Sequence, residues 1–124
     1  MDFPFNSSVN ILGTTYSIEV KKKEEAEGFK GHLGAAGFTT YAAHLIVLRD
    51  VISDSKLSDD EIQQLIIMMK KTLRHEIVHA FLYESGLDRN TSTTSYWARN
   101  EEMVDWIALQ GPKMLKAWEE AGAL

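Results

Sequence analysis

The chain has 124 residues, of which 44% are hydrophobic and 25% are charged, with a formal net charge of −5 and no cysteine. This length suits one globular domain, residues 1–124, and no apolar run approaches the roughly 20 residues that a membrane-spanning helix needs. The lack of cysteine excludes disulfides and thiolate metal sites, and the lack of a dense basic patch argues against nucleic-acid binding.

The first half of the chain predicts β-strands. Residues 9–20 alternate loosely between apolar and polar types and are rich in β-branched side chains, which favours a strand. Gly13 is expected to interrupt this stretch, giving either a short hairpin or one bent strand. Residues 21–37 are charged and then glycine-rich, which predicts a loop. Residues 38–49 predict strand again, with a break near Ala42–Ala43.

Residues 59–85 carry the strongest helical pattern in the chain. Ser58 is a good N-cap, and Glu61 stands three residues later as its capping-box partner. Apolar residues then recur at helical spacing until Gly86, which is a natural stop signal. An unbroken helix of this length would extend on the order of 40 Å, enough to cross the domain.

The last third of the chain predicts a loop followed by helix. Residues 87–95 are polar, and a second helix is expected to begin near residues 96–99. Gly111-Pro112 should break or kink it, which leaves residues 113–121 as a short last helix. Large apolar side chains at helical positions are expected to pack inward here: Trp97, Trp106, Met114, Leu115 and Trp118.

Residues 75–79 read His-Glu-Ile-Val-His inside the long predicted helix. Because residues four apart share one face of a helix, His75 and His79 can direct two imidazoles at one ion, with Glu76 beside them. A catalytic zinc ion needs this set of groups. Two histidines at the edge of the core are the alternative, but this composition produces the pattern by chance only about 0.01 times per chain.

A second acidic motif lies in the downstream helical segment. Glu101 and Asp105 are four residues apart and so share a face, one turn from each other. If Glu101 meets the metal, Asp105 can accept the free N–H of a ligand imidazole and fix its orientation. Glu102 lies about 100° further round the helix and is the less favoured ligand.

These two motifs resemble those of the zincin metallopeptidases, and within them the gluzincin type. In that type the third ligand is a glutamate in a downstream N-E-x-x-[small]-D pattern, which residues 100–105 match, with Val104 at the small position. The resemblance implies that Glu101 is the third zinc ligand and that Asp105 orients His75. The chain is also similar to small phage and mobile-element peptidases of the repressor-cleaving type.

The resemblance implies an α+β fold, in which a small, mostly antiparallel sheet of three or four strands packs on the long helix. It also implies a zinc-dependent peptidase that cleaves a specific protein in a bacterial or phage setting. Glu76 would act as general base toward the metal-activated water and then as general acid toward the leaving amine. A cytoplasmic location is expected because the N-terminus lacks a secretory signal pattern.

Some roles stay open at the level of sequence. The family usually has a further group that stabilises the oxyanion, and the candidates are Tyr83, Tyr96, His44 and Arg74. An extended peptide is expected to bind along an edge strand within residues 39–48.

Two other functions compete with the peptidase. One is a catalytically weak binding or regulatory protein that keeps the metal site and works with a protein partner. The other is a structural zinc site, for which His32 or His44 would have to supply a fourth ligand. We expect His32 to be a solvated loop residue and His44 to be a structural strand residue.

Overall fold

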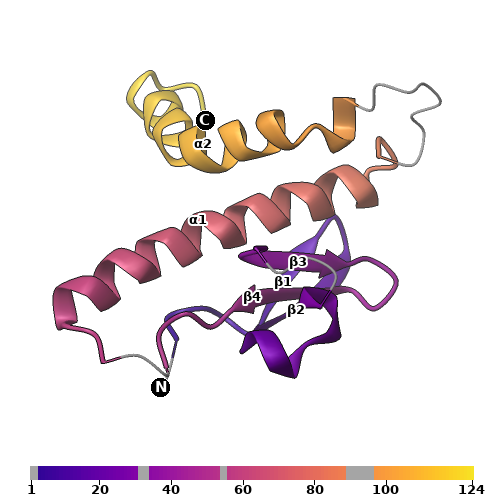
Figure 1. The fold of residues 1–124 in the computed structure, drawn as a ribbon. Helices are drawn as coiled ribbons and strands as arrows, with labels where there is room; N and C mark the ends of the chain where they lie inside the picture. Colours follow the sequence, from indigo (N-terminus) through magenta and orange to yellow (C-terminus); the bar gives the residue numbers. More distant parts are fainter. Residues whose placement is uncertain (1–2, 31–33, 54–55, 89–96) are drawn as a thin grey trace.

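A sheet, a long helix across it and a second helix on the far side of the first make up the fold (Figure 1). The computed structural model describes residues 3–30, 34–53, 56–88 and 97–124. The main elements are β1 (Ser8–Ile11), β2 (Thr14–Lys21), β3 (Gly37–Thr40), β4 (Leu45–Arg49), α1 (Asp59–Glu84) and α2 (Glu101–Glu120). The predicted α+β class is confirmed.

The four strands lie in the order β1-β2-β4-β3. The β1–β2 and β3–β4 pairs are antiparallel, and β2 pairs with β4 in parallel. The sheet is therefore mostly antiparallel, as predicted, and β1 and β3 form its two edges. Of the stretch 39–48, only the part within β3 lies at an edge, because β4 is an inner strand.

The predicted interruption at Gly13 is a tight hairpin turn. Leu12 and Gly13 have φ values of 51° and 93°, the left-handed pair that a two-residue hairpin of right-handed twist requires. The side chain of Asn10 accepts a hydrogen bond of 2.8 Å from the Gly13 N–H. The hairpin, and not the single bent strand, is the form that the chain adopts.

The break near Ala42–Ala43 is also a full turn between two strands. His44 ends this turn with a φ of 50°, and its N–H donates to the Tyr41 carbonyl at 3.1 Å. His44 is exposed and lies in the turn, so the expectation that it stands on a strand is wrong. Its ring lies against that of Tyr16, with the centroids 5.3 Å apart. Its position could not be read from alternation because the turn residues themselves are uncharged and apolar.

Two short helical turns stand in the stretch that was predicted as loop. They are η1 (Lys23–Glu25) and η2 (Glu27–Phe29). Phe29 is buried, and its ring meets Phe38 edge-on with the ring centroids 4.9 Å apart. Because the stretch is rich in glycine, its composition did not predict this small apolar cluster. The cluster packs Phe29 and Ala26 against Val47 of β4 and Phe38 of β3.

The long helix forms as its end signals predicted. The Ser58 side chain accepts from the Glu61 N–H, and the Glu61 carboxylate in turn accepts from the Ser58 N–H. Gly86, with a φ of 87°, follows the last turn. Neither helix in the described residues is long and apolar enough to cross a membrane.

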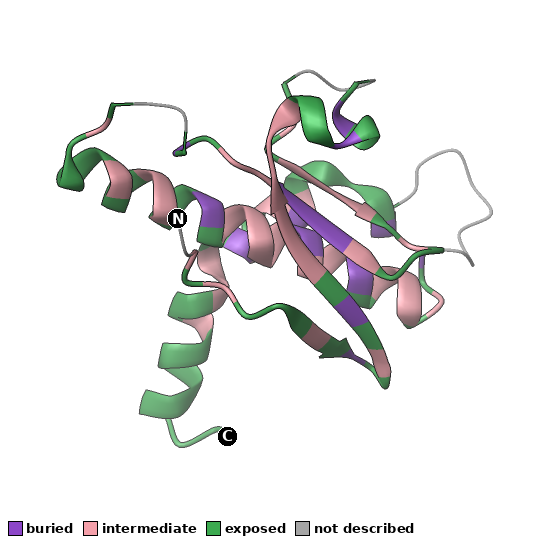
Figure 2. Cartoon of the chain, turned by 90° about the horizontal axis from the view of Figure 1, so that it is seen from below, coloured by how far each residue is buried: buried purple, intermediate pink, exposed green. Residues whose placement is uncertain are grey.

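The main core lies between the sheet and α1. Figure 2 shows the buried residues gathered on the central strands and on the part of α1 that faces them. Ile46 and Leu48 of β4 are fully buried there, together with Tyr16 of β2. The Tyr16 hydroxyl donates a 2.7 Å hydrogen bond to Glu84, which ties the end of α1 to the sheet.

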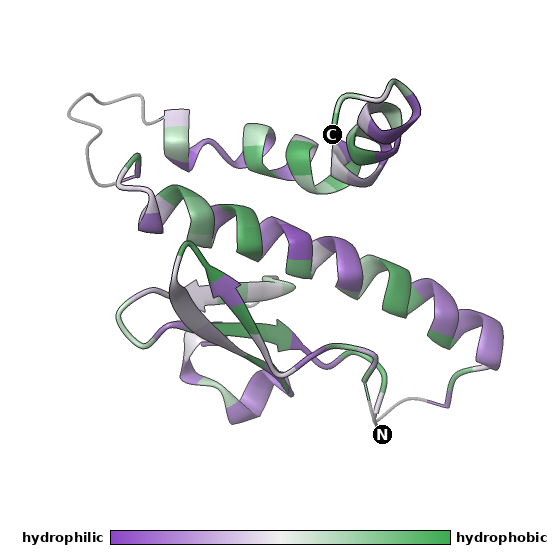
Figure 3. Cartoon of the chain, turned by 180° about the vertical axis from the view of Figure 1, so that it is seen from behind, coloured by the Kyte–Doolittle hydropathy of each residue, from purple (hydrophilic) through white to green (hydrophobic). Residues whose placement is uncertain are grey.

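α2 is one helix that includes Pro112 and changes direction along its length (Figure 1). The kink was predicted, but a separate last helix is not formed. α2 packs on α1 through small buried residues, Val104 and Ala108. Hydrophobic residues occur in α2 both before and after the change in direction (Figure 3). The expected inward packing is wrong for four large side chains, which are 48–56% exposed: Trp97, Trp106, Leu115 and Trp118.

Replacement of Gly37 is expected to loosen the edge strand from α1. A Cβ atom at Gly37 would stand 2.9 Å from the Val47 carbonyl oxygen and 3.0 Å from the Thr72 methyl group. We expect Gly37→Ala to cost about 1–3 kcal/mol of unfolding free energy, as overpacked sites do. Chemical denaturation measures it. Gly34→Ala is the matched control, because a Cβ there meets nothing within 4 Å, and equal stability losses would contradict the prediction.

Candidate metal centre

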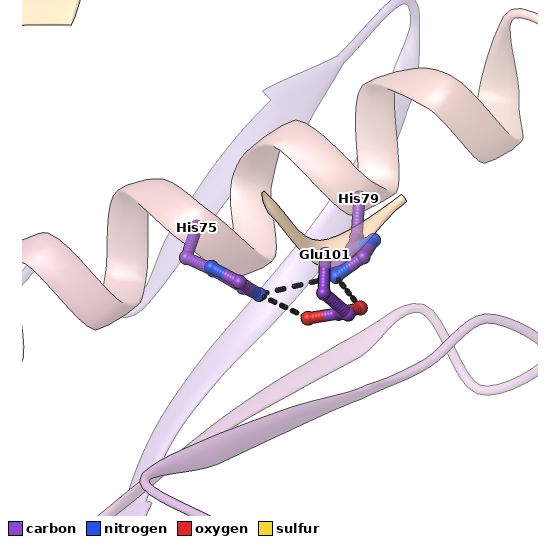
Figure 4. A group of neighbouring side chains, drawn as sticks. All are labelled: His75, His79 and Glu101. Atoms are coloured by element: carbon purple, nitrogen blue, oxygen red, sulfur yellow. Dashed lines mark hydrogen bonds and ion pairs between the residues drawn. The ribbon is translucent and has the colours of Figure 1, made fainter. Parts of the chain in front are cut away.

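Three predicted ligands from α1 and α2 converge on one point (Figure 4). The Nε2 atoms of His75 and His79 are 3.2 Å apart. The Glu101 carboxylate bridges them, with Oε2 3.0 Å from the first nitrogen and Oε1 2.9 Å from the second. The two imidazoles are largely buried, whereas the Glu101 side chain is 69% exposed.

The spacing of these atoms fits a small divalent cation. A tetrahedral zinc ion with ligand bonds of about 2.0–2.1 Å places its ligand atoms about 3.3 Å apart. The three observed separations lie between 2.9 and 3.2 Å, close to that value. His75, His79 and Glu101 are also the cluster of possible ligands found in the described part of the chain. The donor set of two imidazoles and one carboxylate therefore fits zinc.

Asp105 lies behind His75, the position that the resemblance implied. Its Oδ1 is 3.2 Å from the His75 Nδ1 and also pairs with the Lys71 ammonium group. The hydrogen bond from Lys71, supported by that from His75, holds the pKa of Asp105 below its usual value. If an ionised Asp105 accepts the Nδ1–H of His75, the lone pair of Nε2 would be available to a metal ion held between Glu101 and His79.

Substitution of Asp105 is expected to weaken metal binding without unfolding the chain. In Asp105→Asn the amide keeps the shape, but a neutral acceptor holds the imidazole tautomer less well. Zinc affinity should fall by about 10–100-fold, as for other groups that orient metal ligands. Competition with a chromophoric chelator measures the affinity, and thermal unfolding of the metal-free protein serves as the control. Wild-type affinity in this variant would refute the assignment.

Glu76 is buried beside the cluster and does not belong to it. The residue is 7% exposed, and its Oε2 lies 4.0 Å from the His75 Nε2. Its other oxygen, Oε1, accepts a 2.8 Å hydrogen bond from the Thr39 hydroxyl of β3. The edge strand thus fixes the carboxylate that the sequence motif places next to the candidate metal ligands.

A cavity of about 690 Å³ opens over these groups. Its lining comes from residues 35–41, from the second half of α1, from Asp88 and Arg99, and from the first turns of α2. Tyr41 and Tyr83 line it and stack with centroids 4.3 Å apart and ring planes within 10°. Burial, reinforced by the carboxylates of Asp88, Glu76 and Glu101, raises the pKa of Tyr41 to about 12. Its hydroxyl therefore stays protonated and can donate.

The structure distinguishes between the candidates for the group that would stabilise the oxyanion. Tyr83 lines the cavity, whereas Arg74 is engaged elsewhere, donating from Nε to the Ala108 carbonyl at 2.7 Å. His44 lies in the exposed β3–β4 turn and does not line the cavity. Tyr96 and His32, the latter proposed only as a fourth ligand, lie outside the described residues.

Several residues at the site were not identified from the sequence. They are Thr39, Tyr41, Lys71, Asp88 and Arg99, all of which line the cavity. Only Lys71 carried a usable signal, since it lies four residues before His75 on the same helix face. The others come from separate segments of chain, and no spacing rule connects them to the motif.

No family model, no curated protein and no solved structure matches this chain. The fold and the geometry of the site are therefore the basis for any statement about function.

Proposed function

We propose that the protein is a small zinc-dependent peptidase with His75, His79 and Glu101 as metal ligands. The observation that carries the proposal is the convergence of these three side chains beside the buried carboxylate of Glu76. A bound zinc ion would supply a Lewis acid that lowers the pKa of a water molecule and polarises a carbonyl group. Three protein ligands are the number that catalytic zinc sites use.

Glu76 is the group that moves the proton in this proposal. Its carboxylate takes a proton from water as the water attacks the peptide carbonyl, and then delivers it to the leaving amine. The hydrogen bond from Thr39 leaves the oxygen nearer His75 available for this transfer. The neutral hydroxyl of Tyr41, on the same cavity, is suited to donate to the carbonyl oxygen as it gains charge.

The proposed substrate is a protein segment in extended form. β3 is an edge strand, and its residues Gly37, Phe38 and Thr39 line the cavity that holds the metal ligands. An edge strand offers free backbone groups to which an extended peptide can pair. Such pairing would place a peptide bond beside Glu76.

The structural-zinc alternative needs a fourth protein ligand. In the described part of the chain the cluster contains three, and the exposed His44 is not among them. A regulatory protein that binds metal without hydrolysis uses the same three ligands, so activity must separate it from the peptidase.

The direct test uses zinc-loaded protein and a peptide library prepared from a digested bacterial proteome. New peptide termini are identified by mass spectrometry, and metal content is measured on the same sample by native mass spectrometry. One equivalent of zinc together with new termini supports the proposal. One equivalent of zinc without new termini favours the regulatory protein, and no zinc contradicts both.

Thr39→Val is expected to lower the turnover of a cleaved library peptide by about tenfold. This is less than the full contribution of a general base, because Glu76 stays in place but is no longer held by the hydroxyl. The change removes the hydroxyl that holds Glu76 and keeps the shape of the side chain. KM should change little, because the hydroxyl orients the base and not the substrate. Thr39→Ser restores the donor and should restore turnover; a serine variant as slow as the valine variant would refute the role.

A further inference from the structure

The third metal ligand is the least enclosed member of the cluster. The Glu101 side chain is 69% exposed, against 15% for His75 and 13% for His79. Among the described residues, its carboxylate makes hydrogen bonds or ion pairs with the two imidazoles. Since little packs around the side chain, its position depends on where the backbone of α2 begins.

An ion pair joins the beginning of α2 to the end of α1. The Arg99 Nε contacts Oδ1 of Asp88, and its Nη2 lies 3.3 Å from the Asp88 carbonyl oxygen. Asp88 is anchored to the last turns of α1, because its N–H donates to the Leu82 carbonyl at 3.1 Å. Asp88 is only 6% exposed, and a carboxylate buried to that extent needs a cationic partner.

Arg99 stands directly before the cap of α2. The next residue, Asn100, is the N-cap, and its side chain accepts a 2.8 Å hydrogen bond from the Met103 N–H. Glu101 is then the first residue of the helix. Packing holds the chain at Ala98, just before Arg99, and again at Val104 and Ala108, one and two turns into the helix. The pair with Asp88 is the ionic contact at the end that carries the ligand.

We propose that Asp88 and Arg99 form a clamp that positions Glu101 for the metal. Both are positioning residues, because they act through the backbone at the start of α2 and not by contact with the ion. The inference rests on the proposed metal centre and adds to it the pair that completes the site. Without the clamp the two histidines still face each other on α1, but the third ligand is no longer held opposite them.

The test compares zinc affinity in Asp88→Asn and Arg99→Gln with that of the wild type. Both changes remove charge and keep a polar side chain, and Asp88→Asn leaves no buried charge without a partner. We expect affinities about 10–100-fold weaker, the usual effect of groups that orient metal ligands. Glu102→Gln, an exposed carboxylate in the same helical turn, is the matched control and should bind zinc as the wild type does.

A double-mutant cycle with Glu101→Gln shows whether the clamp acts through the ligand. In the Glu101→Gln background, Asp88→Asn should cause no further loss of zinc affinity. An equal loss in both backgrounds would overturn the proposal, because it would indicate a general structural role. Wild-type affinity in both clamp variants would also overturn it while leaving the proposed function intact; failure of the wild type to bind zinc would instead contradict the proposed function and the clamp together.

Discussion

Glu76→Gln is expected to abolish peptide hydrolysis and to leave one equivalent of zinc bound. Glutamine has the shape of glutamate and can still accept the hydrogen bond from Thr39, but it cannot take a proton from water. A general base contributes about 10²–10⁴-fold to the rate, so turnover should fall to near background. Zinc should stay, because Glu76 is not part of the ligand cluster. Terminus mapping and native mass spectrometry on the same preparation measure both quantities.

Glu120→Gln is the control for this variant. It removes one carboxylate from the exposed end of α2 and does not touch the cavity, so both activity and zinc content should match the wild type. Hydrolysis by the Glu76 variant at the wild-type rate would exclude this carboxylate as the base. Loss of zinc in Glu76→Gln would show that Glu76 is itself a ligand.

His75→Ala and His79→Ala are each expected to abolish stoichiometric zinc binding. Each change removes one of three converging ligand atoms and leaves two. Structural zinc in four-ligand zinc-finger peptides binds with about 10–16 kcal/mol, or about 2.5–4 kcal/mol per ligand, so the loss of one ligand should weaken binding by about 10²–10³-fold. The metal content that remains after dialysis against a weak chelator gives the result.

His44→Ala is the matched histidine control. This ring lies on the exposed β3–β4 turn, outside the cavity, and its removal should leave zinc content unchanged. One equivalent of zinc in both His75→Ala and His79→Ala would contradict the proposed centre. Zinc loss in His44→Ala would instead identify a site that involves the turn.

The local signals in the sequence correctly predicted the secondary structure around the site. The capping box at Ser58 and the glycine at residue 86 predicted α1 to within a residue at each end. Helical spacing of four placed His75 with His79, and Glu101 with Asp105, on shared faces, and the structure brings all four together. These predictions succeeded because they depend on contacts within one turn of helix, which neighbouring residues determine.

Predictions that depended on a packing partner failed more often. The helical spacing of Trp106 and Trp118 indicated an apolar face, but periodicity does not say whether another element covers it. Likewise, the loop prediction for residues 21–37 missed the burial of Phe29, since its partner Phe38 follows only after the glycines. A pattern within one segment carries no information about which other segment meets it.

The sequence by itself determined the long helix, the two histidines on one face of it and the acidic pair that follows. Only the tertiary structure decided that Thr39 donates to Glu76, that Tyr41 lines the same cavity as the two histidines, and that Arg99 pairs with Asp88. The physical reason is distance along the chain. Contacts within a helical turn follow from backbone geometry, whereas contacts between segments depend on how the sheet and the two helices pack.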